Sequence, residues 1–98
     1  MTNTIETAIK ELAEKLKQTG VREIKYTQGV EGWRTIEVNG DDITAAPFPD
    51  PQTEQLIDDI DLLYSILSHE KRIPPVEDEG VEVSTEVYGI TFKVELWA

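Results

Sequence analysis

The segment from Asp50 to Arg72 most constrains the fold, because it predicts one long amphipathic helix. Asp50 is a favoured N-cap, and Pro51 suits the first helical position, where its missing N–H costs no hydrogen bond. The pair Pro74-Pro75 ends the helix. Apolar residues recur at the three- and four-residue spacing of a buried helix face: Leu56, Ile60, Leu63 and Leu67, with Ile57 and Tyr64 beside them.

The opposite face of this helix is acidic. Its residues at helical spacing are Glu54, Asp58, Asp61 and Ser65, and Asp59 lies alongside. Because like charges this close repel one another, grouping them costs some stability. A binding role would explain why these charges are kept together, so we expect an exposed stripe that binds a partner. The alternative is a charged face that serves only solubility.

The charge of the chain is strongly asymmetric. Residues 1–38 carry six acidic and six basic side chains, whereas residues 39–98 carry 14 acidic and three basic ones, so the formal charge of −11 comes from residues 39–98. Glu77, Asp78 and Glu79 extend the negative field beyond the helix. Such a chain should repel nucleic-acid phosphates and anionic membranes and attract basic protein surfaces.

The rest of the chain is predicted to form a second helix and five strands. An apolar stripe from Ile5 to Leu16 predicts a helix, with Asn3 as N-cap and Gly20 as the stop. Asn39-Gly40 is a strong two-residue hairpin signal. The expected helix spans residues 4–18, and the expected strands span residues 21–28, 33–38, 41–45, 81–87 and 90–96.

The last two strands should form a hairpin with Tyr88-Gly89 at its tip. This arrangement pairs Val87 with Ile90, Thr85 with Phe92 and continues to Leu96, with the apolar residues all on one face. One long strand with a bulge at Gly89 is the alternative. A tight primed turn would need positive φ at Tyr88, so the turn geometry stays open.

These elements predict a single domain over residues 1–98. Because each strand has an apolar and a polar face, we expect an antiparallel sheet of about five strands with two helices on one face, an α+β two-layer sandwich. The expected core on the sheet is Ile24, Tyr26, Ile36, Val38, Val83, Phe92, Val94 and Leu96. The expected core on the helices is Ile9, Leu12, Leu16, Leu56, Ile60, Leu63 and Leu67.

Two tryptophans are predicted on the sheet face opposite the helices. Trp33 and Trp97 fall on the polar sides of their strands, and Tyr88, Lys93, Lys25 and Thr35 should share that face. Tryptophan is enriched at interface anchors, so both are candidate binding residues. The alternative is that each ring folds onto neighbouring side chains.

The sequence predicts no enzyme, no cofactor and no metal. Cysteine is absent, and the only histidine, His69, suits the C-terminal end of a helix. Asp58, Asp59 and Asp61 could in principle bind a hard cation, but they lack a ligand loop. No apolar run approaches 18 residues and no secretory signal is visible, so we expect a cytoplasmic protein without a membrane span.

Two groups of proteins are similar in architecture and charge. The order helix–strand–strand–strand–helix–strand–strand resembles the type III secretion chaperones, which are small, acidic and dimeric, although this chain is shorter and lacks their final helix. The size and acidity resemble phage-encoded inhibitors such as some anti-CRISPR and anti-restriction proteins, whose carboxylates imitate DNA phosphates. Both resemblances are analogies of fold or composition.

The first functional hypothesis is therefore an inhibitor or regulator that occupies a basic surface of a partner protein, including a surface that binds nucleic acid. Its contact would be the acidic helix face and the acidic connection after it. A homodimeric chaperone or adaptor that uses the open sheet face is the alternative. A small metal-dependent enzyme is a weaker one.

Overall fold

The structure is a computed structural model that describes residues 4–45, 49–73 and 80–97. It confirms the expected order of helices and strands and the α+β class. The elements are α1 (Thr4–Gln18), β1 (Glu23–Gly29), β2 (Arg34–Val38), β3 (Asp41–Asp42), α2 (Pro51–His69), β4 (Glu82–Val87) and β5 (Ile90–Trp97).

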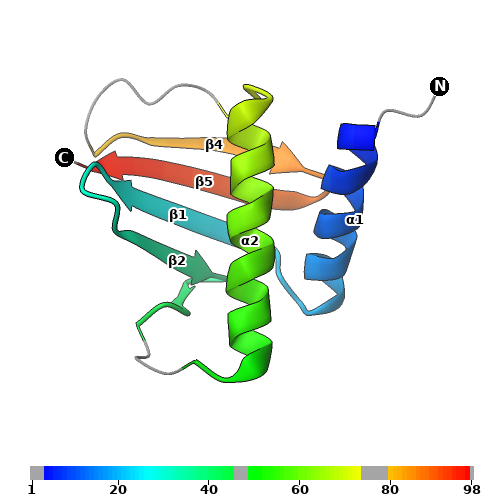
Figure 1. Cartoon of the computed structure of the whole chain (residues 1–98), viewed down its shortest axis with the longest axis horizontal. Coiled ribbons are helices and arrows are strands. Elements are labelled where there is room, and N and C mark those ends of the chain that lie inside the picture. Colours follow the sequence, from blue (N-terminus) through cyan, green and yellow to red (C-terminus); the bar gives the residue numbers. More distant parts are fainter. Residues whose placement is uncertain (1–3, 46–48, 74–79, 98) are drawn as a thin grey trace.

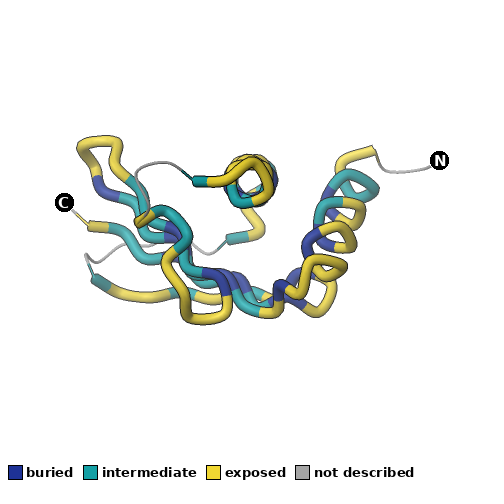
Figure 2. Tube along the Cα trace, turned by 90° about the horizontal axis from the view of Figure 1, so that it is seen from below, coloured by how far each residue is buried: buried dark blue, intermediate teal, exposed yellow. Residues whose placement is uncertain are grey.

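The molecule has a sheet layer and a helix layer. Figure 1 shows α2 crossing the face of the sheet, and Figure 2 shows α2 end-on above it. Helix α1 stands beside α2 at the end of the sheet where β1 begins and the β4–β5 turn lies. The other face of the sheet carries no helix among the described elements. We call it the open face.

The sheet is mixed, and this corrects the expectation of a purely antiparallel one. Its strand order is β3-β2-β1-β5-β4, and the central pair β1 and β5 is parallel, whereas the other pairs are antiparallel. Alternating apolar residues fix which side chains face the helices, but they do not fix which strands are neighbours. Three apolar side chains of β5, those of Ile90, Phe92 and Val94, are buried, which suits a strand inside the sheet.

The core lies between the sheet and the two helices, as expected. Phe92 stacks beside Tyr26 and Tyr64, with ring centroids 6.5 and 6.4 Å away, under the middle of α2. Four expected core residues are only partly buried: Leu12, Leu56, Val83 and Leu96. The core also includes residues not on the expected list: Ala13, Val21, Ile57, Val87 and Ile90.

Helix α2 begins as predicted and ends three residues early. The Asp50 carboxylate accepts a hydrogen bond from the Thr53 N–H at 2.8 Å, and Pro51 is the first helical residue. The helix ends at His69 because Lys71 adopts a left-handed φ of 56°, and the Arg72 N–H then bonds back to the Leu67 carbonyl. This is the geometry that closes many helices. The expected stop at Pro74-Pro75 lies outside the described residues.

Two tight hairpins set the register of the sheet. Asn39 and Gly40 both have positive φ, 52° and 91°, as a primed two-residue turn requires. Tyr88 and Gly89 have nearly the same φ values, 47° and 91°, so the expected hairpin is confirmed. Tyr88 adopts the positive φ that is unfavourable for a residue with a side chain. The expected pairs Val87 with Ile90 and Thr85 with Phe92 are formed, and the ladder continues to Glu82 with Glu95, one residue short of the expected Leu96.

Strand β3 is shorter than expected. It covers only Asp41–Asp42, not residues 41–45. The Asp42 carboxylate accepts hydrogen bonds from both the N–H and the hydroxyl of Thr44, at 2.8 and 2.6 Å. This local turn competes with strand pairing and ends the strand.

Candidate protein-binding site

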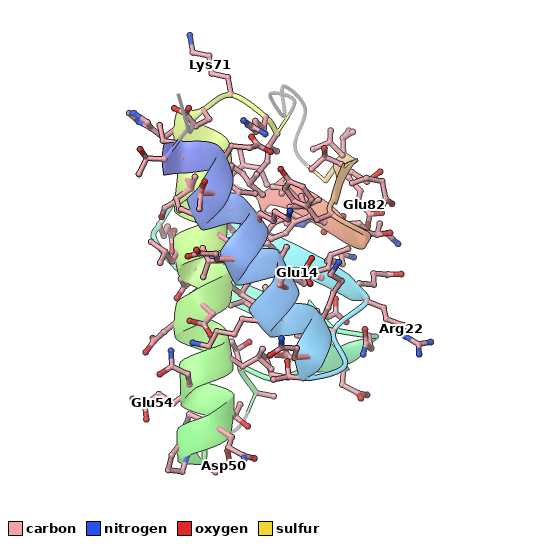
Figure 3. The ribbon with its side chains drawn as sticks, turned by 90° about the vertical axis from the view of Figure 1, so that its right-hand side faces the viewer. Glu14, Arg22, Asp50, Glu54, Lys71 and Glu82 are labelled. Atoms are coloured by element: carbon pink, nitrogen blue, oxygen red, sulfur yellow. The ribbon has the colours of Figure 1, made fainter. Side chains whose placement is uncertain are left out.

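Two members of the predicted acidic stripe lie on the outer surface of α2. Glu54 and Asp58 are exposed, and the exposed face continues through Leu62, Ser65 and His69. Figure 3 shows Glu54 projecting from the side of α2 that faces away from the sheet. These two carboxylates are available to a partner.

Asp61 departs from the predicted stripe, because its carboxylate is engaged within the fold. Arg34 holds it with two hydrogen bonds of 2.8 Å, from Nε and Nη2, and the Tyr26 hydroxyl donates a third of 2.8 Å. The bidentate pair raises the pKa of the Arg34 guanidinium, chiefly through its hydrogen bonds to Asp61. Asp61 therefore joins α2 to β1 and β2, and the expectation that it is a free surface charge is wrong.

Asp59 is also structural. The residue is only 8% exposed, and its carboxylate accepts a hydrogen bond of 3.0 Å from Gln55. Lys15 on α1 lies 3.1 Å from the other carboxylate oxygen, so the ion pair joins the two helices. Lys15 and Asp59 line a groove between α1 and α2, together with Leu16 and Leu56. Asp59 therefore lies at the helix interface, where a docking protein would not meet a free charge.

Tyr26 gives these contacts a pH signature. Burial, and then the hydrogen bond to Asp61, raise the pKa of Tyr26 well above its ordinary value near 10. Above pH 10 the unfolded chain loses the phenolic proton of Tyr26, whereas the folded chain keeps it. The stabilisation that Tyr26 gives the folded state is therefore complete below pH 10 and declines as pH rises further.

We therefore expect Tyr26 to ionise later than a tyrosine in water. An absorbance titration of the folded protein should show a late phase that disappears in Tyr26→Phe and persists in Tyr88→Phe, the matched control. Asp61→Ala should move that phase to lower pH, because it removes the hydrogen bond to the phenol. A wild-type titration with all three tyrosines ionising at the ordinary value would contradict the assignment.

Five exposed carboxylates lie along one edge of the molecule. Residues 35–70 contain no lysine or arginine. Helix α2 starts at the edge of the sheet where β3 is the outermost strand (Figure 1). The exposed carboxylates of these two elements and the cap define what we call the acidic face: Asp41, Asp42, Asp50, Glu54 and Asp58.

Elsewhere on the molecule, bases offset some of the acids. Six of the nine lysine and arginine side chains form ion pairs with carboxylates of the described residues. On the open face, Lys93 lies 3.0 Å from Glu23, which raises the pKa of that lysine, and Lys25 lies 3.6 Å from Glu82. The acidic face has no ion pair among the described residues, whereas the carboxylates without one elsewhere, such as Glu11, Glu31 and Glu86, are spread over other elements. The predicted contacts Glu77, Asp78 and Glu79 lie outside the described residues.

Both tryptophans are partly exposed at one end of the sheet. Trp33 is 44% exposed and its indole packs against Gly29, since a Cβ on that glycine would come within 2.1 Å of the ring. Trp97 is 40% exposed, covers Gly80, and donates from Nε1 to the Glu95 carboxylate at 2.6 Å. Each ring thus keeps an exposed side.

Strand pairing brings the tryptophans to the same end of the sheet. Gly29 is paired with Trp97 in the parallel register, and the Val30 N–H bonds to the Trp97 carbonyl at 2.8 Å. Val30 and Val81 are exposed there as well. Lys25 and Lys93 share the open face, as expected. The expectation for Tyr88 is wrong, because its hydroxyl bonds to Glu6 on α1 at the other end of the strands.

The described parts of the chain contain no arrangement of side chains suited to binding a metal ion. No group of three or more histidine, aspartate or glutamate side chains there could hold an ion. His69 is exposed in the last turn of α2. The aspartates that could in principle have bound a cation are also separated, because Asp59 faces α1 and Asp61 faces the sheet.

The fold and these surfaces define a small acidic α+β protein with one strongly negative edge. Comparison of the chain with protein families, with functionally described proteins and with solved structures gave no match. Neither described helix is both long enough and apolar enough to cross a membrane.

Proposed function

We propose that this chain is a non-enzymatic binding protein that inhibits or regulates a partner by occupying a basic surface on it. The observation that carries the proposal is the acidic face. Its carboxylates are exposed and they belong to a segment without any lysine or arginine. Two bases that contact α2, Lys15 and Arg34, are held by Asp59 and Asp61.

Physical reasons favour a basic partner over a neutral one. A cluster of one sign speeds the encounter with a surface of the opposite sign and orients it. The same cluster repels nucleic acid, so a nucleic-acid-binding surface on a protein is a suitable target whereas nucleic acid itself is not. Partners of this kind should be released as salt rises, because salt screens exposed charges.

The test is affinity capture from cells of the source organism at low and high salt. The double variant Glu54→Lys with Asp58→Lys should fold normally, because both side chains are exposed, and should lose partners that the wild type releases at high salt. Glu11→Lys with Glu31→Lys is the matched control, since it makes the same change in net charge at exposed sites outside the acidic face.

The captured partner then allows a direct measurement. Its affinity should fall in the acidic-face variant, and the dependence of affinity on salt should become shallower, while the control variant keeps both. Added duplex DNA should compete if the occupied surface binds nucleic acid. Identical capture by the two double variants would mean that the acidic face only keeps the protein in solution.

A homodimeric adaptor is the second candidate function. The observation that favours it is the group of exposed apolar side chains at one end of the sheet: Val30, Trp33, Val81 and Trp97. Sedimentation of the purified chain distinguishes the two candidates, because a homodimer sediments with twice the mass of a single chain.

A further inference from the structure

Strand β4 forms an edge of the sheet that no described strand covers. It is the last strand in the order β3-β2-β1-β5-β4, and Figure 1 shows it along the upper border. An uncovered edge presents backbone N–H and C=O groups that another strand can pair with. The acidic face lies at the opposite, β3 edge, so the two surfaces are separate.

The hairpin register identifies the outward groups. Val87 and Ile90 flank the two-residue turn, and such flanking residues exchange both backbone hydrogen bonds. In an antiparallel pair the bonded positions alternate, so Val83 and Thr85 also point their N–H and C=O toward β5. The residues between them, Glu82, Ser84 and Glu86, therefore point their backbone groups away from the sheet.

The side chains of these three residues are exposed on the open face. Glu82 lies 3.6 Å from Lys25 and 3.9 Å from Lys93 on that face, and the Glu86 carboxylate accepts a hydrogen bond from the Thr91 hydroxyl at 2.8 Å. Each carboxylate oxygen has two lone pairs, so both side chains have room for a further donor, and Glu86 has no ion pair among the described residues. Two negative side chains thus lie four residues apart along an edge that can accept a strand.

We propose that the β4 edge binds an extended basic segment of another protein, which adds to the sheet as an antiparallel strand. Backbone hydrogen bonds to Glu82, Ser84 and Glu86 would give affinity, and side chains at alternate positions would give specificity. Lysine or arginine residues four apart in the segment would lie opposite Glu86 and Glu82, where opposite charges stabilise a cross-strand pair.

The exposed Val81 and Trp97 lie at one end of the same edge. Trp97 extends from β5 over Gly80, just before β4 begins. An apolar residue two positions beyond the second basic residue would reach this indole. The segment that fits best therefore combines two basic residues with an apolar one.

A second copy of this chain fits the edge less well. Two β4 strands related by a two-fold axis, with Ser84 at the centre, would place Glu82 of each strand opposite Glu86 of the other. Like charges directly opposite one another destabilise a strand pair. Charge therefore favours a basic segment over self-pairing.

The experiment uses the full chain and a blocked synthetic peptide that has lysines four residues apart, threonine midway between them and leucine two residues after the second lysine. The informative variant is Ser84→Pro, because proline removes an outward N–H that the sheet does not use. Ser84→Thr keeps that N–H and is the matched control.

We expect the peptide to bind the wild type and Ser84→Thr, and to protect the amides of Glu82, Ser84 and Glu86 from hydrogen exchange. Ser84→Pro and Glu86→Lys should each weaken binding by at least about tenfold. If Ser84→Pro fails to fold, Glu86→Lys and the exchange pattern of the wild type decide the question.

Three results would overturn the proposal. They are equal binding by Ser84→Pro, equal binding of a peptide with glutamates in place of the lysines, and self-association of the chain that Ser84→Pro abolishes. The last would make the edge a contact between copies. The Glu54→Lys, Asp58→Lys variant should bind the peptide like the wild type, so a failure of this proposal is distinct from a failure of the acidic face.

Discussion

Replacing Leu63 by alanine is expected to lower the free energy of unfolding by about 2–5 kcal/mol, the usual range for a core leucine. The Leu63 side chain is fully buried, with 0% exposure, on the side of α2 that packs against the sheet. Truncation removes apolar contacts and leaves a cavity that the surrounding rigid elements fill only in part. Urea unfolding followed by circular dichroism measures the loss.

The neighbouring Leu62 provides a matched control for this measurement. It is the same residue type, one position earlier in the same helix, but it is 52% exposed. Leu62→Ala should therefore change the free energy of unfolding by no more than about 0.5 kcal/mol. Equal effects at the two positions, or a larger effect at Leu62, would mean that the opposite face of α2 is buried.

The local features of the fold were predictable because short-range chemistry determines them. The Asp50 cap, the spacing of Leu63 and its neighbours, and the Asn39-Gly40 turn each carry a signal within a few residues. The parallel pairing of β1 with β5 has no such signal. It depends on where α2 returns the chain to the sheet, and the alternating pattern of β5 would suit either neighbour.

The candidate site was only half predictable for a related reason. Helical spacing correctly placed Glu54 and Asp58 on one surface, but Asp59 and Asp61 lie at the two borders of the buried face. Their environment depends on Lys15 and Arg34, which are far away in the sequence and are brought close by the fold. The signal that was available is the position of each acid beside the apolar stripe, where a neighbouring element can reach it.

Asp61→Ala is the second large expected effect, and it tests this correction directly. The change leaves the hydroxyl of the buried Tyr26 without its acceptor and Arg34 without its bidentate partner. An unsatisfied buried polar group costs about 1–3 kcal/mol. The ion pair itself adds less than a fully buried one would, because both side chains are about one-third exposed and water screens them, at 35% for Arg34 and 32% for Asp61.

The control is Asp58→Ala, which removes the same carboxylate from an exposed position three residues earlier. Its effect on the free energy of unfolding should stay within about 0.5 kcal/mol. Combining Asp61→Ala with Tyr26→Phe separates the hydrogen bond from general packing, because residues in direct contact show a coupling of about 0.5–3 kcal/mol in a double-mutant cycle. Purely additive effects, or equal losses of unfolding free energy at Asp58 and Asp61, would mean that Asp61 lies on the outer surface of α2 without these contacts. The acidic face would then extend along three turns of the helix.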